Sequence, residues 1–389
     1  MSSTHINLDY ASATPILPEV RRALDVALSE TGNPSSIHQT GRWARRLLDQ
    51  SRRQTAALIN AKPDELFFTS CGTESNNWAL RGILTANKRK GNHLILSSIE
   101  HPSLSLAARR LENEGAEVTV LPVDPEGVVP ADRLKAALKK ETVLVSIMLA
   151  NAEVGSLQPI QALASAAHEA GALFHTDAIA AIGHLPVDVK ALGADLLSLS
   201  ANQFYAPSGA AALYVREGVR ILPLLEGGGQ ETGARSGTEA LVCIVGMGAA
   251  AEVAKREMTQ RGSRLARLRD RLGNGLKERV ESIRFNGSFA ARLPHNLNVC
   301  FEGLSAESLI LGLDQAGIVA GLGSACNSKA MRPSHVLKAM GLTDEQAKGA
   351  VVFTVGIMTT EDEIERSLEI IPNVVKKLRR VTSLTARAQ

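Results

Sequence analysis

Between about residues 65 and 215, short runs of consecutive apolar residues alternate with longer stretches in which apolar residues recur every three or four positions. The short runs have the length and apolar content of strands buried on both faces, and the longer stretches have the period of amphipathic helices. We therefore expect an α/β fold in which helices cover both faces of a mainly parallel sheet. The expected strands are residues 66–69, 93–96, 117–120, 143–148, 173–175 and 196–199, and the expected helices include 103–114 and 160–170.

The C-terminal third has a different pattern, which begins with a helical stretch from about residue 239 to 281. This helix should bridge into a smaller α+β domain that contains strands at 296–301 and 351–355, and the polar tail from residue 382 is expected to fray. A chain of 389 residues is long enough for two domains. We place the large α/β domain at residues 16–257 and the small domain at residues 1–15 and 258–389.

Charge is nearly balanced, with 43 basic and 40 acidic residues, so no broad electrostatic field would attract nucleic acid or an anionic membrane. No apolar run is long enough to span a membrane, and residues 1–5 lack the character of a signal peptide. The cysteines Cys71, Cys243, Cys300 and Cys326 are far apart, which is typical of a reducing compartment. We expect a cytoplasmic protein without nucleic-acid or membrane partners, with the first three cysteines in the core.

Five residues each follow one expected strand of the sheet: Thr73, His101, Ala152, Asp177 and Gln203. Ligands of open α/β sheets gather at the carboxyl ends of the strands. We therefore expect these five positions to lie close together and to mark the functional site.

Several ordered sequence blocks resemble the pyridoxal 5′-phosphate (PLP)-dependent cysteine desulfurases, the NifS- and IscS-like proteins of the class V aminotransferase group. They include Thr-Ser-Cys-Gly-Thr-Glu-Ser-Asn-Asn at 69–77, Glu-His at 100–101, His-Thr-Asp-Ala at 175–178, Arg-Ser-Gly-Thr at 235–238 and Gly-Ser-Ala-Cys at 323–326. Blocks spread over most of the chain are more specific than one short motif. The resemblance implies a fold-type I PLP-transferase architecture, with a mainly parallel seven-stranded sheet in the large domain and a smaller α+β C-terminal domain.

The resemblance also assigns cofactor contacts to residues that the chain retains. The family's phosphate contacts match Gly72, Thr73, Ser200 and Thr238, the last across a dimer interface. Asp177 would pair with the pyridine nitrogen, and His101 would stack on the ring and exchange protons. Simpler roles also fit these residues: Thr73 as a helix cap, Asp177 as the cap of a turn and His101 as a loop residue.

Other positions of the cleft have lost the groups that the family uses. Gln203 stands where the family has the lysine that forms an imine with PLP, and a carboxamide nitrogen does not condense with an aldehyde. Ala152, Ala180 and Asn202 replace ring and phosphate contacts, and Ile357 replaces the arginine that binds the substrate carboxylate. We therefore expect no covalent PLP aldimine and weak binding of free cysteine.

Cys326 follows a run of small residues that resembles the loop on which desulfurases carry the nucleophilic cysteine that becomes a persulfide. Lys329 could help to stabilise its thiolate. We expect Cys326 to act with His101 as a catalytic residue, either as a persulfide carrier or as one ligand of a shared iron–sulfur cluster whose other ligands come from a partner. The alternative is an inert exposed thiol.

Three functions remain open at this stage. The first is a pseudoenzyme of sulfur transfer or iron–sulfur cluster assembly, a homodimer that works without standard PLP catalysis and with an iron–sulfur scaffold or a sulfur-acceptor protein. The second is a low-activity PLP-dependent cysteine desulfurase that converts cysteine to alanine and an enzyme persulfide, with PLP held noncovalently by Thr73, Asp177, Ser200 and Thr238. The third is a noncatalytic regulatory dimer.

Overall fold

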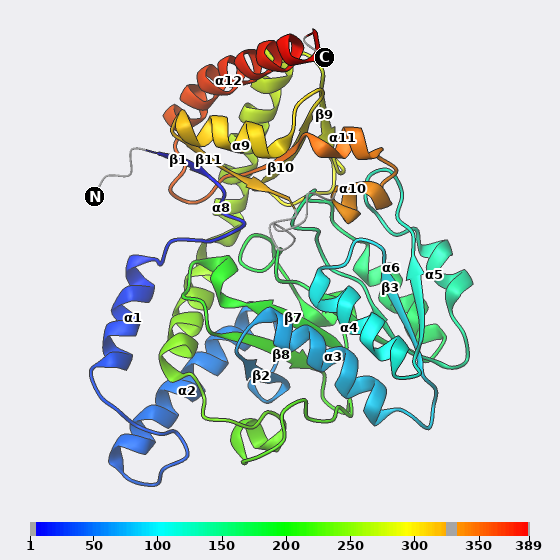
Figure 1. Cartoon of the computed structure of the whole chain (residues 1–389). Helices are drawn as coiled ribbons and strands as arrows, with labels where there is room; N and C mark the ends of the chain where they lie inside the picture. Colours follow the sequence, from blue (N-terminus) through cyan, green and yellow to red (C-terminus); the bar gives the residue numbers. More distant parts are fainter. Residues whose placement is uncertain (1–4, 324–332, 388–389) are drawn as a thin grey trace.

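A seven-stranded sheet in the order β2-β8-β7-β6-β5-β3-β4 forms the centre of the larger part of the molecule (Figure 1). The computed structural model describes residues 5–323 and 333–387. Every neighbouring pair is parallel except the two that involve β8, so the predicted mainly parallel α/β sheet is confirmed. The strands are β2 (Leu66–Thr69), β3 (His93–Ser97), β4 (Glu117–Leu121), β5 (Thr142–Ser146), β6 (Leu173–Asp177), β7 (Leu196–Ser200) and β8 (Ala211–Val215).

Helices pack around this sheet because each buries an apolar stripe. Helix α3 packs against β7, β8 and α4, whereas α1 and α2 pack against the long helix α8. The α-helices of this part are α1 (Pro18–Leu28), α2 (Gln39–Leu58), α3 (Gly72–Ala86), α4 (Pro102–Asn113), α5 (Ala131–Ala137), α6 (Ile160–Glu169) and α7 (Val189–Leu192). Short 3₁₀ turns are η1 (Pro63–Glu65), η2 (Ala201–Phe204) and η3 (Gln230–Gly233).

A second sheet, in the order β1-β11-β12-β10-β9, forms the smaller part at the top of Figure 1. The N-terminal strand β1 pairs in parallel with β11, which places the start of the chain in the sheet formed by its C-terminal third. The strands are β1 (Ile6–Leu8), β9 (Ile283–Asn286), β10 (Asn296–Phe301), β11 (Ile318–Leu322) and β12 (Ala350–Thr354). The helices are α9 (Ala306–Gln315), α10 (His335–Ala339), α11 (Asp344–Lys348) and α12 (Glu361–Arg387).

Helix α8 (Leu241–Arg279) runs through both parts, as the long helical pattern predicted. Its residues up to Met258 belong to the core of the larger part, whereas Leu265 and the buried residues after it belong to the core of the smaller part. This change of core within one helix supports a domain boundary near residues 257 and 258, and the proposed division into domains stays a prediction.

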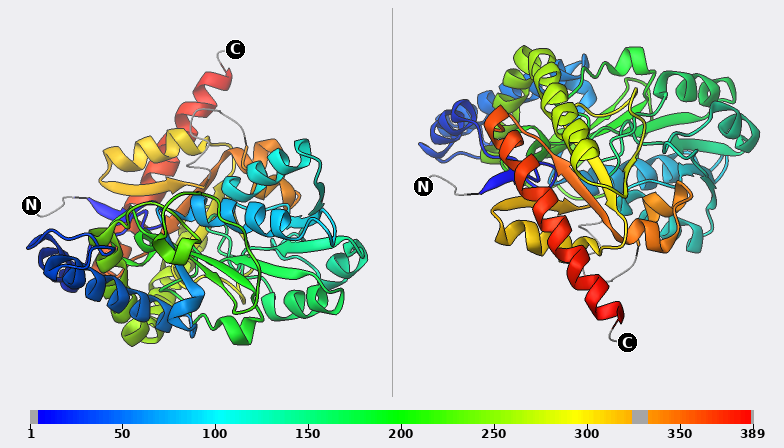
Figure 2. Two further views of the ribbon diagram at one scale, coloured as in Figure 1. Left: turned by 90° about the horizontal axis from the view of Figure 1, so that it is seen from below. Right: turned by 90° about the horizontal axis from the view of Figure 1, so that it is seen from above.

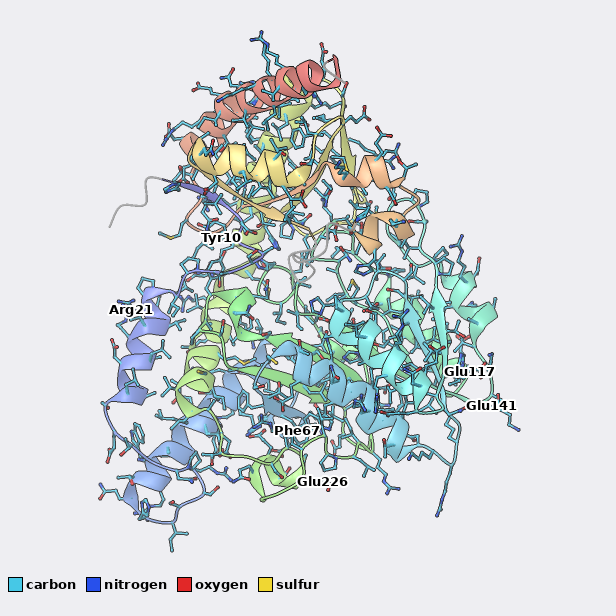
Figure 3. The ribbon with its side chains drawn as sticks, in the orientation of Figure 1. Tyr10, Arg21, Phe67, Glu117, Glu141 and Glu226 are labelled. Carbon is cyan, nitrogen blue, oxygen red and sulfur yellow. The ribbon has the colours of Figure 1, made fainter. Side chains whose placement is uncertain are left out.

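The segment after β1 crosses the junction between the two parts, where Figure 3 labels Tyr10. The ring of Tyr10 lies against Gly356, because a Cβ added to Gly356 would come within 2.1 Å of the ring. The backbone N–H of Ala11 donates to the hydroxyl of Thr354 on β12 at 2.9 Å, and the hydroxyl of Thr14 donates to the carbonyl of Asn202 at 2.8 Å. The segment therefore joins β12 to the turn that follows β7.

Two sequence-based expectations are wrong. Residues 382–387 are not a frayed tail, because α12 continues to Arg387 and extends beyond the body of the molecule (Figure 2). Adding residues to an existing helix costs little free energy when none of them is proline or glycine. Cys71 is exposed rather than in the core, because it precedes α3 at the open edge of the sheet, whereas Cys300 is buried as expected and Cys243 is half-buried.

No helix in residues 5–323 and 333–387 combines the length and the apolar content that a membrane span needs.

Candidate functional site

A cavity of about 460 Å³ lies between the carboxyl ends of the large-sheet strands and the smaller sheet. Five positions singled out from the sequence line it: His101, Ala152, Ala180, Asn202 and Gln203. The smaller part closes the other side with residues of β11 and β12 and with His335 of α10. The structure therefore brings together residues that follow β3, β5, β6 and β7, as expected for the carboxyl edge of a parallel sheet.

Gln203 sits on a tight turn, η2, directly after β7. Its side-chain nitrogen Nε2 donates to the main-chain carbonyl of Ala11 at 3.1 Å, and the main-chain carbonyl of Gln203 lies 3.2 Å from Nε2 of the buried His184. The turn ends at Tyr205, which has φ of 72°, a conformation that non-glycine residues rarely adopt. The Tyr205 N–H donates to the hydroxyl of Thr14 at 3.0 Å, so the N-terminal segment helps to hold this backbone.

The predicted phosphate contacts Gly72 and Ser200 lie close to each other. A Cβ added to Gly72 would lie 3.7 Å from Cβ of Ser200 and only 2.2 Å from Cδ1 of Ile179, so a larger residue would displace the end of the Ile179 side chain. The hydroxyl of Ser200 donates to Oδ1 of Asn202 at 2.7 Å. The side-chain oxygen of Asn202 is therefore already bonded to Ser200.

Thr73 and Thr238 are exposed, and neither belongs to the cavity lining of the described chain. The N-cap of α3 is Cys71, not Thr73, and the Cys71 side chain makes no capping bond. The alternative role of Thr73 as a helix cap is therefore wrong. The predicted contact of Thr238 across a dimer interface stays a prediction.

Hydrogen bonds link the buried Asp177, at the end of β6, through Asn76 and Ser103 to the exposed His101, which follows β3. Asn76 on α3 donates to Oδ2 of Asp177 at 2.7 Å and to the hydroxyl of Ser103 at 2.9 Å, while the N–H of Ile179 donates to Oδ1 of Asp177 at 2.9 Å. His101 caps α4, because its Nδ1 accepts from the N–H of Ser103 at 3.1 Å. Burial raises the pKa of Asp177 and lowers the pKa of His101, so burial disfavours charge on both groups.

Two carboxyl groups of the site, Glu100 and Glu153, were not singled out from the sequence. Burial raises the pKa of Glu100 to about 8, although Ser97 Oγ and the Met148 N–H donate to its Oε1 at 2.6 and 2.9 Å. Burial also raises the pKa of Glu153 to about 7. The Glu153 carboxyl lies against Gly323, where a Cβ would come within 2.6 Å of Oε1. Both residues line the cavity.

Cys326, the predicted catalytic thiol and cluster ligand, lies outside the described residues. The nearest described residues on its two sides are Gly323 and Pro333, and both Gly323 and His335 line the cavity. Ile357 is half-buried, its N–H donates to the hydroxyl of Tyr205 at 3.1 Å, and its aliphatic side chain offers no polar contact.

Comparisons with known proteins agree with the fold. A model of the family described as aminotransferase class V matches residues 6–366. A protein of Dictyoglomus turgidum named cysteine desulfurase IscS is 45% identical over 378 residues, which cover 97% of this chain and 96% of the relative. A protein of Methanosarcina thermophila with the same name is 45% identical over 383 residues, covering 98% and 95%. A solved structure of a NifS-like protein matches with a TM-score of 0.90 at 32% identity, covering 96% of this chain and all of that chain.

Proposed function

Because the chain belongs to the class V aminotransferase family and, within it, to the cysteine desulfurases, we propose that it serves sulfur transfer or iron–sulfur cluster assembly without covalently bound PLP. The relatives named cysteine desulfurase support sulfur chemistry as the general function. One observation carries the finer proposal: Gln203 lines the cavity on the turn after β7, at the position where the family has its lysine.

The side chain of Gln203 supports the absence of an imine. Its amide nitrogen is delocalised into the carbonyl and is already used as a donor to Ala11, so it has no lone pair with which to attack an aldehyde. No lysine occurs between residues 191 and 254, and none lines the cavity within the described part of the chain. A nearby amine that could replace the missing one is therefore not available among these residues.

The remaining donor set fits PLP only in part. Gly72, Ser200 and Asp177 are retained, but the Ser200 hydroxyl donates to Asn202, and Asp177 accepts from Asn76 and from the Ile179 N–H. Ala152 and Ala180 present methyl groups to the cavity and donate no side-chain hydrogen bond to a ring. The set therefore does not fit covalent capture of PLP, and no step of the proposed function passes through that cofactor.

Cys326 is the proposed sulfur carrier, supported by the described flanking residues Gly323 and His335 at the cavity wall. Its thiolate attacks the outer sulfur of a persulfide donor, the donor's S–S bond breaks, and the donor leaves as a thiol. The Cys326 persulfide then passes its outer sulfur to an acceptor thiol by the same exchange. A cluster held at Cys326 would need further ligands from a scaffold partner, since one thiolate does not hold a cluster.

The test is to incubate the full chain with a low-molecular-weight persulfide and to locate the added sulfur by peptide mass spectrometry. We expect one extra sulfur atom on Cys326, transfer of that sulfur to an acceptor thiol, and loss of both in Cys326→Ser. The exposed Cys71 is the internal control for unspecific reaction. Sulfur on Cys71 to the same extent as on Cys326, or none on Cys326, would contradict the proposal.

A further inference from the structure

Two buried histidines stack on each other where the larger and the smaller part of the molecule meet. His184 lies in the loop after β6 of the larger part, and His295 immediately precedes β10 of the smaller part. The ring centroids are 3.8 Å apart at an interplanar angle of 27°, and the two residues are 5% and 4% exposed. A direct contact between the two parts is therefore made by imidazoles, whose ordinary pKa is about 6.5.

The pair connects the turn that carries Gln203 to the smaller sheet. Nε2 of His184 lies 3.2 Å from the main-chain carbonyl of Gln203, and the carbonyl of His295 accepts from the N–H of Val355, directly after β12, at 3.0 Å. Helix α8 passes beside the pair, since a Cβ added to Gly262 would lie 3.3 Å from the carbonyl oxygen of His184. Because Gln203 lines the cavity, a movement at this pair would change the cavity wall.

Neither imidazole has an acidic partner. Nδ1 of His295 is buried without a hydrogen-bond partner, and within residues 5–323 and 333–387 no carboxylate forms an ion pair with His184 or His295. The rest of the sequence, residues 1–4, 324–332 and 388–389, contains no aspartate or glutamate. A proton gained by either ring would therefore be buried without a side-chain carboxylate to stabilise it.

The charges around the pair are mainly positive. Burial lowers the pKa of His184 to about 4, with Arg261 adding to the decrease, and burial, the neighbouring His184 and Arg269 lower the pKa of His295. The other charged or titratable groups of this region are Tyr10, Tyr205, Arg264, Asp270 and Arg292. Of these groups only Asp270 is negative, and its carboxylate is already bonded to Arg269 at 2.8 Å.

We propose that the stacked histidines form an acid-sensitive latch between the two parts of the molecule. While both rings are neutral, the stack holds the turn after β7 against the smaller sheet. When both rings gain a proton, two like charges face each other at 3.8 Å in a buried site, and the turn and the sheet separate, which opens the cavity between them. The proposal goes beyond the proposed function and does not involve Cys326.

The closed arrangement should weaken as the pH falls. In the open state the imidazoles regain an ordinary pKa of about 6.5, whereas in the closed state the pKa of His184 is about 4. The contribution of the neutral rings is therefore complete above about pH 6.5 and is lost as the pH falls from there toward 4. For His184 alone, the equilibrium constant for opening should rise roughly 30-fold between about pH 7.5 and about pH 5.

Hydrogen–deuterium exchange of the full chain at about pH 7.5 and about pH 5 tests the latch at two backbone amides. The N–H of Val355 donates to His295 itself, and the N–H of Ile357 donates across the junction to the hydroxyl of Tyr205 at 3.1 Å. After correction for the intrinsic exchange rate, we expect the protection of both amides to fall at least tenfold at the lower pH. The amides of β5, which is paired on both sides, should keep their protection.

Two substitutions remove the titrating nitrogens and keep the other contacts. His295→Phe leaves an aromatic ring in the stack, and His184→Gln leaves a donor for the carbonyl of Gln203. Each should reduce the acid-dependent loss of protection at Ile357 at least threefold, and the double variant should abolish it. If the phenylalanine variant folds poorly, His295→Gln provides the same test.

His38→Asn is the matched control, because it removes an exposed histidine and retains a residue that can cap α2. This variant should lose protection like the parent chain. Cys326→Ser should also behave like the parent chain, which separates the latch from the sulfur-transfer proposal. Equal protection at the two pH values, an equal loss in β5, or an unchanged loss in the double variant would overturn the proposal.

Discussion

At position 203 the side chain is a carboxamide whose nitrogen donates to the carbonyl of Ala11, a residue 192 positions away in the sequence. The neighbouring groups support this turn from several directions, since Thr14 accepts from the Tyr205 N–H and His184 contacts the Gln203 carbonyl. The turn keeps a strained φ at Tyr205. The turn therefore holds residue 203 in a defined position, and the site differs from that of the family in carrying a carboxamide there instead of an amine.

Glu100 makes the stability of the fold depend on pH. Its pKa of about 8 exceeds the ordinary carboxyl value because of burial, so the folded chain binds a proton that the unfolded chain releases above about pH 4.5. The contribution of Glu100 to stability is therefore complete below that pH and is lost as the pH rises through about 8.

We expect Glu100→Gln to stabilise the chain at alkaline pH, because an amide cannot ionise while its oxygen can still accept from Ser97 and Met148. The stability of Glu100→Gln relative to the parent chain, measured as the free energy of unfolding, should be about 4 kcal/mol higher at pH 9 than at pH 5. Urea unfolding at both pH values measures this difference. Glu112→Gln is the exposed control, and an equal effect of Glu100→Gln at the two pH values would contradict the assignment of a neutral buried carboxyl.

Only part of the site could be predicted from the sequence. The position of a polar residue directly after an apolar strand was enough to predict that His101, Ala152 and Gln203 share one cavity. Glu100 and Glu153 stand next to two of these residues, and that adjacency was the available signal, but burial separates them from ordinary surface carboxylates. Burial depends on chain segments far apart in sequence, so it could not be read from the local pattern.

At the level of elements, continuous apolar runs identified the strands of the larger sheet because such runs are buried on both faces. The limits of helices were less predictable. Helix α12 continues past residue 382 because no proline or glycine ends it there, whereas α6 ends just before Gly171, which has φ of 73°. The end of α6 could therefore be predicted from a local glycine, whereas α12 has no such signal at residue 382 and propagates beyond the body of the molecule.

The glycines of α8 predict opposite effects of the same substitution. A Cβ at Gly248 would come within 2.6 Å of the Ser51 backbone on α2, so Gly248→Ala should force the helices apart and destabilise the fold by about 1–3 kcal/mol. A Cβ at Gly273 would meet only Leu297 and Phe285 at 3.5 Å or more. Gly273→Ala should therefore stabilise the chain by about 0.5–1 kcal/mol through the better helix propensity of alanine. Chemical unfolding of the two variants checks this, and destabilisation by Gly273→Ala would count against the described packing.

At the scale of the whole molecule, large apolar side chains are exposed near the N-terminal end. Leu28 is 66% exposed and Ile37 is 90% exposed, with Ile16 and Val26 also exposed in the same stretch. Large apolar side chains exposed along one stretch of the sequence are candidates for a protein–protein interface. The expected homodimer, in which Thr238 of one copy would reach the cavity of the other, stays a prediction for which these side chains suggest an interface.

Sedimentation equilibrium tests this assembly. We expect a dimer for the parent chain, and we expect Leu28→Asp combined with Ile37→Asp to weaken dimerisation at least tenfold, because the change places two charges in an apolar interface. Leu311→Asp on α9 is the matched control, since Leu311 is 63% exposed in the smaller part. A monomeric parent chain, or equal weakening by the control, would refute the proposed interface.

The most direct test of the central claim is the mass of the chain after incubation with PLP at one equivalent and reduction with borohydride, which fixes any imine as a stable amine. We expect no pyridoxyl group on the parent chain and one on residue 203 of Gln203→Lys, mapped by peptide mass spectrometry. A parent chain that gains one pyridoxyl group at a single lysine, together with rapid alanine formation from cysteine, would contradict the account.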